Sequence, residues 1–282
     1  MARFKIGIMA DGLRLPLFEG IAKSKELGAE GIQLYATHGA MAPENLPREK
    51  RRELLAFIRS QRLAVSALCG DPGGHGFGDA EKNPARIAMS KAIIDLALDL
   101  DCAVVTTHIG IVPEREDDPV RLVMQKACRE LALYAAEREA AFAIETGPEP
   151  AARLRGFLDS LECDGGMGVN FDPANLVMVI GEDPTESLAH LAPYIVHTHA
   201  KDGRMYKKAD PKVVYGISSH GGLDMNDYFR ELPLGEGDVD FPRYLDALAR
   251  TGYEGFLTIE REEGENPERD IAVAVEFLRT LV

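Results

Sequence analysis

Short apolar runs alternate with longer segments of helical period along nearly the whole 282-residue chain. Each run has the length of one strand, and the longer segments repeat apolar residues every three or four positions, as amphipathic helices do. The predicted strands are Lys5–Met9, Gly31–Tyr35, Ala64–Leu68, Ala103–Thr107, Phe142–Glu145, Gly168–Phe171, Ile195–His199 and Phe256–Glu260. Predicted helical segments include Leu17–Leu27, Arg48–Gln61, Pro84–Leu100, Pro119–Arg138 and Ala151–Leu161.

Eight strands, each followed by a helical segment, predict a single (β/α)₈ TIM barrel over residues 1–282. A doubly wound sheet is the competing fold. It would place a glycine fingerprint after the first strand, where the sequence instead reads Ala10-Asp11-Gly12. After the seventh strand, we expect a long loop at about residues 200–239 to cover the site as a lid.

The composition excludes several classes of protein. A net charge of −14 disfavours nucleic acid and anionic membrane surfaces as partners. There is no run of about 18 uncharged apolar residues, so we expect no membrane span. The four cysteines are far apart, which indicates reduced thiols rather than a disulfide framework. Because the first residues also lack the apolar run of a secretory signal, a cytoplasmic location is expected.

Ionisable side chains follow the last four predicted strands at the points where they end. Glu145, Asp172 and Glu260 are carboxylates, and His199 is an imidazole. The carboxyl ends of barrel strands meet at one mouth, so these groups should converge. Three buried carboxylates repel one another unless a cation lies between them. The pattern therefore predicts one divalent metal ion, with Mn²⁺ as the first choice and Mg²⁺, Co²⁺ or Zn²⁺ as alternatives.

A simpler interpretation stays open for this quartet. Barrel mouths are polar in any case, and Glu260 begins the charged run Glu260-Arg261-Glu262-Glu263, which solvent alone could stabilise. Four ionisable residues at successive strand ends nevertheless favour a metal site over a solvated surface.

Four motifs resemble those of the xylose-isomerase-like TIM barrels, and more narrowly the sugar phosphate isomerase/epimerase branch. They are Ala143-Ile144-Glu145-Thr146-Gly147, Asn170-Phe171-Asp172-Pro173-Ala174-Asn175, His197-Thr198-His199-Ala200-Lys201-Asp202 and Thr258-Ile259-Glu260. The resemblance implies that Glu145, Asp172, His199 and Glu260 bind the metal. The H-x-K-D pattern selects His199 over His197. Asn175 departs from the family, many of whose members have histidine there.

Five further residues are candidates for substrate binding: His75, His108, Asn175, Lys201 and Arg204. Each has an ordinary structural alternative. His75 could be a solvated loop residue, His108 a structural one, and Arg204 a surface one. Asn175 can donate a hydrogen bond to a hydroxyl but is a poor ligand for a second metal. His197 is interpreted as a packed neighbour of the site rather than a ligand.

The expected function is a divalent-metal-dependent isomerase or epimerase of a small sugar or sugar phosphate. It would abstract a proton next to a carbonyl through a metal-stabilised enediolate, with Glu145 and Glu260 as the catalytic acid and base. The same site could serve a cyclitol or keto acid, as in inosose dehydratase or hydroxypyruvate isomerase. An endonuclease-type barrel and a non-catalytic binding barrel are less well supported. The substrate, the metal and any homo-oligomer stay open.

Overall fold

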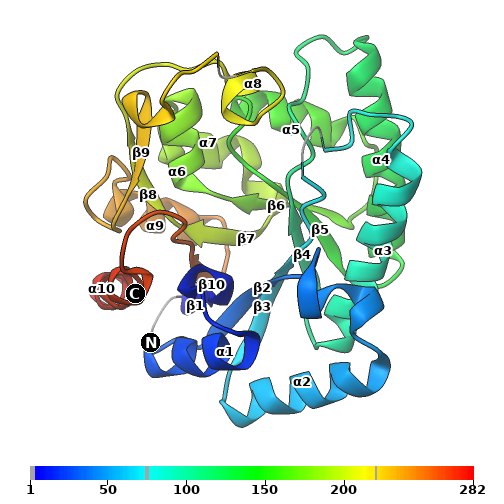
Figure 1. The fold of residues 1–282 in the computed structure, drawn as a ribbon. Helices are drawn as coiled ribbons and strands as arrows, with labels where there is room; N and C mark the ends of the chain where they lie inside the picture. The colour runs from blue at the N-terminus through cyan, green and yellow to red at the C-terminus, as the bar shows by residue number, and fades with distance from the viewer. Residues whose placement is uncertain (1–3, 74–75, 220) are drawn as a thin grey trace.

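Parallel strands close into a barrel in the computed structural model, which describes residues 4–73, 76–219 and 221–282 (Figure 1). Within the described residues, eight strands pair in the order β1-β10-β7-β6-β5-β4-β3-β2. They are β1 Lys5–Met9, β2 Gly31–Tyr35, β3 Ala64–Cys69, β4 Val104–Thr107, β5 Ala141–Glu145, β6 Met167–Phe171, β7 Ile195–Ala200 and β10 Phe256–Ile259. The predicted (β/α)₈ barrel is confirmed.

Helices connect the strands and cover the outside of the barrel (Figure 1). They are α1 Leu17–Glu26, α2 Arg48–Ser60, α3 Asn83–Asp99, α4 Pro119–Ala136, α5 Ala151–Asp159, α6 Pro173–Asn175, α7 Pro184–Leu191, α8 Pro211–Val214, α9 Phe241–Arg250 and α10 Pro267–Arg279. The first and last of these helices are joined by an ion pair of 3.3 Å between Lys23 Nζ and Glu268 Oε1. Among the helices described, none is both long and apolar enough to cross a bilayer.

Local sequence signals explain where several helices begin and end. The Asp118 side chain accepts the Val120 N–H as the N-cap of α4, and Pro119 follows at the first helical position. Gly28 lies just after α1 with φ +102°, a left-handed conformation that glycine adopts without steric cost. Such ends keep the helices short enough to return the chain to the same end of the barrel after every strand.

The long segment after β7 has regular structure of its own, which corrects the expectation of a loop over residues 200–239. It contains β8 Asp202–Met205 and β9 Phe229–Leu232, which pair antiparallel, and α8 lies between them. The Asp202 carboxylate accepts the N–H groups of Gly203, Gly235, Gly237 and Val239. It therefore holds the two ends of the segment together.

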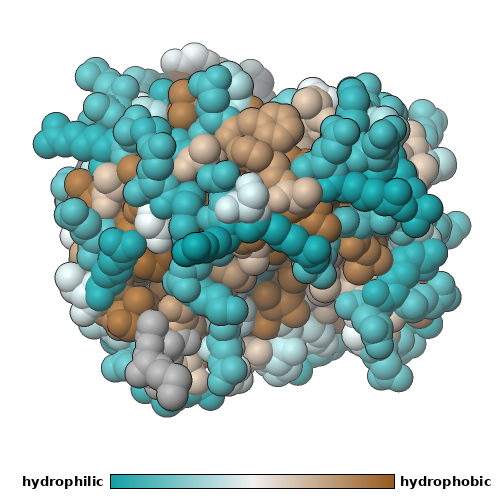
Figure 2. Space-filling model, turned by 90° about the horizontal axis from the view of Figure 1, so that it is seen from below, coloured by the Kyte–Doolittle hydropathy of each residue, from teal (hydrophilic) through white to brown (hydrophobic). Residues whose placement is uncertain are grey.

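The outer surface agrees with the strong negative charge of the chain. In Figure 2, hydrophilic residues cover most of the face seen from below, and hydrophobic residues are interspersed among them. The apolar residues of the strands are buried instead; Ile8, Ile32, Leu68 and Val105, for example, are inaccessible to solvent. Strands buried on both faces are typical of a parallel barrel surrounded by helices.

Candidate metal centre and active site

Glu145, Asp172, His199 and Glu260 converge at the carboxyl ends of four neighbouring strands, β5, β6, β7 and β10. Each offers one ligand atom, and these atoms all lie within 4.8 Å of one another. His199 Nδ1 is 3.3 Å from Asp172 Oδ2, 3.3 Å from Glu260 Oε2 and 3.6 Å from Glu145 Oε1. All four residues are buried.

The three carboxylates of this cluster repel one another, and a cation among them would reduce the repulsion. Burial alone would lower the pKa of His199, but Glu260 and Glu145 outweigh it and raise that pKa well above its ordinary value. Burial raises the pKa of Asp172, because its charge is removed from water. The three carboxylates therefore favour a positive charge among them. Three carboxylates and one imidazole are also a donor set that suits a divalent metal, so the residues fit such an ion.

Two polar residues inside the barrel fix the orientation of His199 and Glu145. His199 Nε2 lies 3.0 Å from Gln33 Oε1, and the Gln33 amide donates in turn to Thr106 Oγ1 at 2.9 Å. Nδ1 of His199 is thereby left facing the three carboxylates. The Asn170 amide donates to Glu145 Oε2 at 3.0 Å. A polar side chain next to a metal ligand commonly sets its direction in this way.

The sequence analysis missed Gln33 and Asn170, although each is a polar residue within an otherwise apolar predicted strand. It placed His197 correctly beside the site. His197 Nδ1 lies 2.8 Å from Asn170 Oδ1, and its Nε2 lies 3.0 Å from Thr258 Oγ1. Burial and the neighbouring His199 lower the pKa of His197 well below its ordinary value. It is a neutral packed residue outside the ligand cluster.

Asp172 is held by the local structure at the start of α6. Its Oδ1 accepts the Asn175 N–H at 2.9 Å as an N-cap, while Oδ2 faces His199. Asn175 contributes a second contact, since its amide donates to Glu145 Oε1 at 3.0 Å. Asn175 also lines the pocket above the cluster, where the sequence analysis expected it to meet a substrate.

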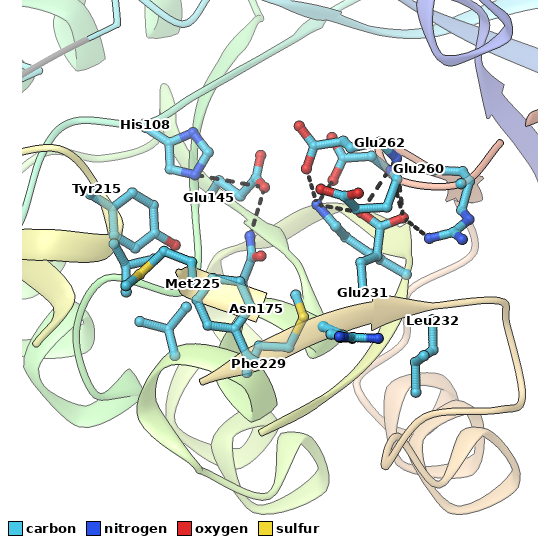
Figure 3. Close-up of a pocket in the computed structure, with 18 of the residues that line it drawn as sticks. His108, Glu145, Asn175, Tyr215, Met225, Phe229, Glu231, Leu232, Glu260 and Glu262 are labelled. Atoms are coloured by element: carbon cyan, nitrogen blue, oxygen red, sulfur yellow. Dashed lines mark hydrogen bonds and ion pairs between the residues drawn. The ribbon is translucent and has the colours of Figure 1, made fainter. Parts of the chain in front are cut away.

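A pocket of about 680 Å³ opens above the four side chains (Figure 3). His108, Glu145 and Asn175 form one polar side, and Glu231, Glu260 and Glu262 gather on the other. The segment between β7 and α9 supplies an apolar wall: Val214, Tyr215, Met225, Phe229, Leu232 and Pro233. The segment therefore forms part of the pocket.

His108 lies beside Glu145 and is oriented by Asp71. Its Nδ1 is 3.1 Å from Asp71 Oδ2, and its Nε2 is 3.7 Å from Glu145 Oε1. Among the described residues, this Nε2 has no hydrogen-bond partner. Burial lowers the pKa of His108, but Glu145 and Asp71 outweigh it and raise the pKa to about 9. Asp71, which lies at the start of the loop after β3, was not among the predicted site residues.

Lys201 is buried in the pocket wall. Its Nζ is 2.8 Å from Glu260 Oε2, 2.5 Å from Glu262 Oε2 and 3.8 Å from Glu231 Oε2. Burial would lower the pKa of Lys201, but the nearby carboxylates raise this pKa well above its usual range. Glu260 has the largest raising effect. Lys201 thus stays charged and holds Glu260 in place.

One of the predicted substrate contacts lies outside the pocket. Arg204 is on β8, where its Nε donates to Asp238 Oδ1 at 2.7 Å, and it is not among the described residues that line the pocket. Its position on a hairpin strand, which the sequence analysis took for a loop, directs the side chain away. His75 lies outside the described residues.

Comparisons with known proteins agree with the barrel fold. Residues 21–281 match the family described as Xylose isomerase-like TIM barrel. The rhizopine catabolism protein MocC of Rhizobium meliloti is 35% identical over 112 residues, which are 38% of this chain and 32% of that protein. This chain spans less than two thirds of the length of the curated relatives that it matches.

Several solved structures share the fold along the whole chain. The xylose isomerase domain protein of Planctomyces limnophilus superposes with a TM-score of 0.78 at 27% identity, covering 99% of this chain and 96% of that one. The probable 3-DHS dehydratase AsbF of Bacillus anthracis gives 0.74 at 19% identity, with 98% and 99% covered. A D-tagatose 3-epimerase-like protein gives 0.72 at 19% identity, with 99% and 97% covered. At these identities the last two show a common fold.

Proposed function

Because the chain belongs to the xylose isomerase-like TIM-barrel family, we propose that it is a divalent-metal-dependent isomerase or epimerase of a small sugar-like substrate. The observation that carries the proposal is the buried cluster of Glu145, Asp172, His199 and Glu260 at the base of an open pocket. Enzymes of isomerase, epimerase and dehydratase type share the fold.

Glu145, Asp172, His199 and Glu260 would hold the ion through one atom each. When bound, a divalent ion supplies Lewis-acid polarisation of a substrate carbonyl and a neighbouring hydroxyl. Gln33 and Asn170 keep His199 and Glu145 aimed at that position before substrate arrives. The folded protein thus orients these side chains before the substrate binds, so they need not reorganise during the reaction.

Glu145 and Glu260 are the proposed proton carriers, since they lie on opposite sides of the cluster and both line the pocket (Figure 3). Glu260 uses Oε2 to meet His199 and Lys201, so Oε1 is the oxygen that would take the proton. Lys201 and His199 lower the pKa of Glu260 well below its usual range against the opposing effect of burial. It therefore enters the reaction as a carboxylate. Glu145, in its protonated form, would give its own proton to the other face of the substrate, and both carboxyl groups would then exchange protons with solvent.

Glu260→Gln tests the proposal. We expect the purified protein with added Mn²⁺ to exchange the hydrogen next to the carbonyl of a ketose for deuterium from D₂O. The exchange is measured by NMR. The variant should lower that exchange by about 10²–10⁴-fold, the usual effect of losing a general base. Glu254→Gln, at the far end of β10, is the matched control and should retain exchange. Full exchange in the Glu260 variant would rule out its role.

A second candidate reaction is the dehydration of a keto-cyclitol. The observation in its favour is His108, whose Nε2 faces the pocket beside Glu145 and whose Nδ1 is held by Asp71. An imidazole in that place could protonate a departing hydroxyl after the proton next to the carbonyl is removed. Ultraviolet absorbance of the resulting conjugated enone distinguishes this reaction from isomerisation, whose product has no carbon–carbon double bond.

A further inference from the structure

The pocket lining carries more acidic than basic groups. Among the described residues that line it, the carboxylates are Asp71, Glu145, Glu231, Glu260, Glu262 and Glu263, and the basic side chains are His108, Lys201, Arg230 and Arg261. Asp172 adds a seventh carboxylate in the ligand cluster at the base of the pocket. Seven carboxylates and four basic groups leave a formal charge of −3, and one divalent ion reduces it to −1. A second anion in this space would meet net repulsion.

Three of the four basic groups already have carboxylate partners, and for His108 these are Asp71 and Glu145. Lys201 contacts Glu260, Glu262 and Glu231. Arg261 Nη1 is 2.6 Å from Glu231 Oε1, and its Nε is 3.0 Å from Asp270 Oδ2. Both side chains are almost fully buried, so a phosphate would have to replace these partners rather than add to them. Arg230 is exposed at the rim, where its Nε donates to the Asn226 carbonyl at 3.4 Å.

The pocket is also larger than one monosaccharide requires. A hexose has twelve heavy atoms, which need about 360 Å³ even at the roughly 30 Å³ that a water molecule occupies in the liquid. The pocket holds about 680 Å³. Part of its wall is apolar and is formed by Met225, Phe229 and Leu232, which matches the largely apolar lining of small-molecule sites.

We infer that the site takes an uncharged carbohydrate carrying a neutral substituent, such as a second sugar ring, and discriminates against phosphate esters. This inference rests on the proposed proton-transfer function and narrows its substrate class. The polyhydroxyl end of the substrate meets the carboxylate cluster, and the substituent packs against Phe229 and its neighbours. A phosphate in this pocket would share it with Glu262 and Glu263, which both line it.

Three ketoses that differ only at one oxygen test the inference: D-fructose, D-fructose 6-phosphate and isomaltulose, which carries a glucosyl group on O6. Deuterium exchange from D₂O is measured for each with Mn²⁺-loaded protein. We expect kcat/KM to be highest for isomaltulose and at least about tenfold lower for the 6-phosphate. Fastest exchange with the 6-phosphate would overturn the inference alone, whereas no exchange with any of the three would count against the proposed function.

Charge substitution separates electrostatic rejection from simple misfit. Glu263→Lys places a cation at the rim and should raise kcat/KM for the 6-phosphate relative to isomaltulose by about tenfold. Glu254→Lys makes the same change outside the pocket and should leave the ratio as in the wild type. An unchanged ratio in the Glu263 variant would contradict the inference. The inference would also be wrong if the wild type preferred the 6-phosphate and the Arg230→Gln variant lost that preference. Arg230 would then bind the phosphate group.

Discussion

Glu149 is a buried carboxyl group that lies four residues beyond the ligand Glu145. It is 2% exposed, and its Oε2 accepts the Val112 N–H at 2.9 Å. Burial raises the pKa of Glu149 to about 7, because the hydrogen bond and the charge of Arg153 offset only part of the lost hydration. The folded protein therefore holds a proton on this residue at a pH where the unfolded chain has already lost it.

This proton makes stability depend on pH in a defined direction. As pH rises from 4.5 to about 7, the folded state binds more protons than the unfolded state, so the contribution of Glu149 to stability falls. Glu149→Gln mimics the protonated form. We expect it to be nearly neutral at pH 5 and to stabilise the protein by up to about 3 kcal/mol at pH 8, by urea unfolding.

Glu116→Gln serves as the control, since Glu116 is an exposed carboxyl on the preceding loop. Its effect should be small at both pH values. A difference between the Glu149 variant and the wild type that stays constant from pH 5 to pH 8 would contradict the predicted titration.

At the scale of elements, the hairpin of β8 and β9 is coupled to the site through Glu231. This β9 residue accepts from Arg261 Nη1 and from the N–H groups of Glu262 and Glu263. It also faces Lys201, which holds Glu260. The hairpin is therefore attached to the loop that begins at a proposed metal ligand.

Glu231→Gln should weaken this attachment, because a neutral amide no longer balances Lys201 and Arg261. Each cation keeps another carboxylate partner, so the expected cost is below the 3–5 kcal/mol of a fully broken buried pair, at about 2 kcal/mol in urea unfolding. Glu236→Gln, an exposed change in the same segment, should cost less than about 0.5 kcal/mol. Equal effects of the two changes would show that the Glu231 contacts add no stability.

For the whole molecule, the proposed ligands come from four adjacent barrel strands, so one ion would connect half of the closed sheet. Binding only to the folded state at a hundred times the dissociation constant stabilises it by about 2.7 kcal/mol. We expect Mn²⁺ to raise the melting temperature by roughly 5–10 °C and a chelator to reverse the rise. Asp172→Asn should lose the shift, and Asp164→Asn, on the surface, should keep it. A shift of equal size in the Asp172 variant would place the ion elsewhere.

The alternation of strand and helix periods determined the barrel, because each apolar run can be buried only between helices and other strands. The same pattern located Glu145, Asp172, His199 and Glu260, since residues at the carboxyl ends of parallel strands must share one mouth. These features depend on neighbours in sequence and on a topology that repeats. They could be predicted without knowing any contact between distant residues.

Tertiary structure alone decided which other residues serve the site. Gln33 meets His199 across 166 positions of the chain, and Lys201 meets Glu260 across 59. Whether a strand residue faces into the barrel depends on register, which a shift of one residue reverses. Asp202 likewise accepts hydrogen bonds from the N–H groups of Gly235 and Gly237, more than thirty residues away. These contacts accompany the pairing of β8 with β9, in which Glu231 lines the pocket and Arg204 does not.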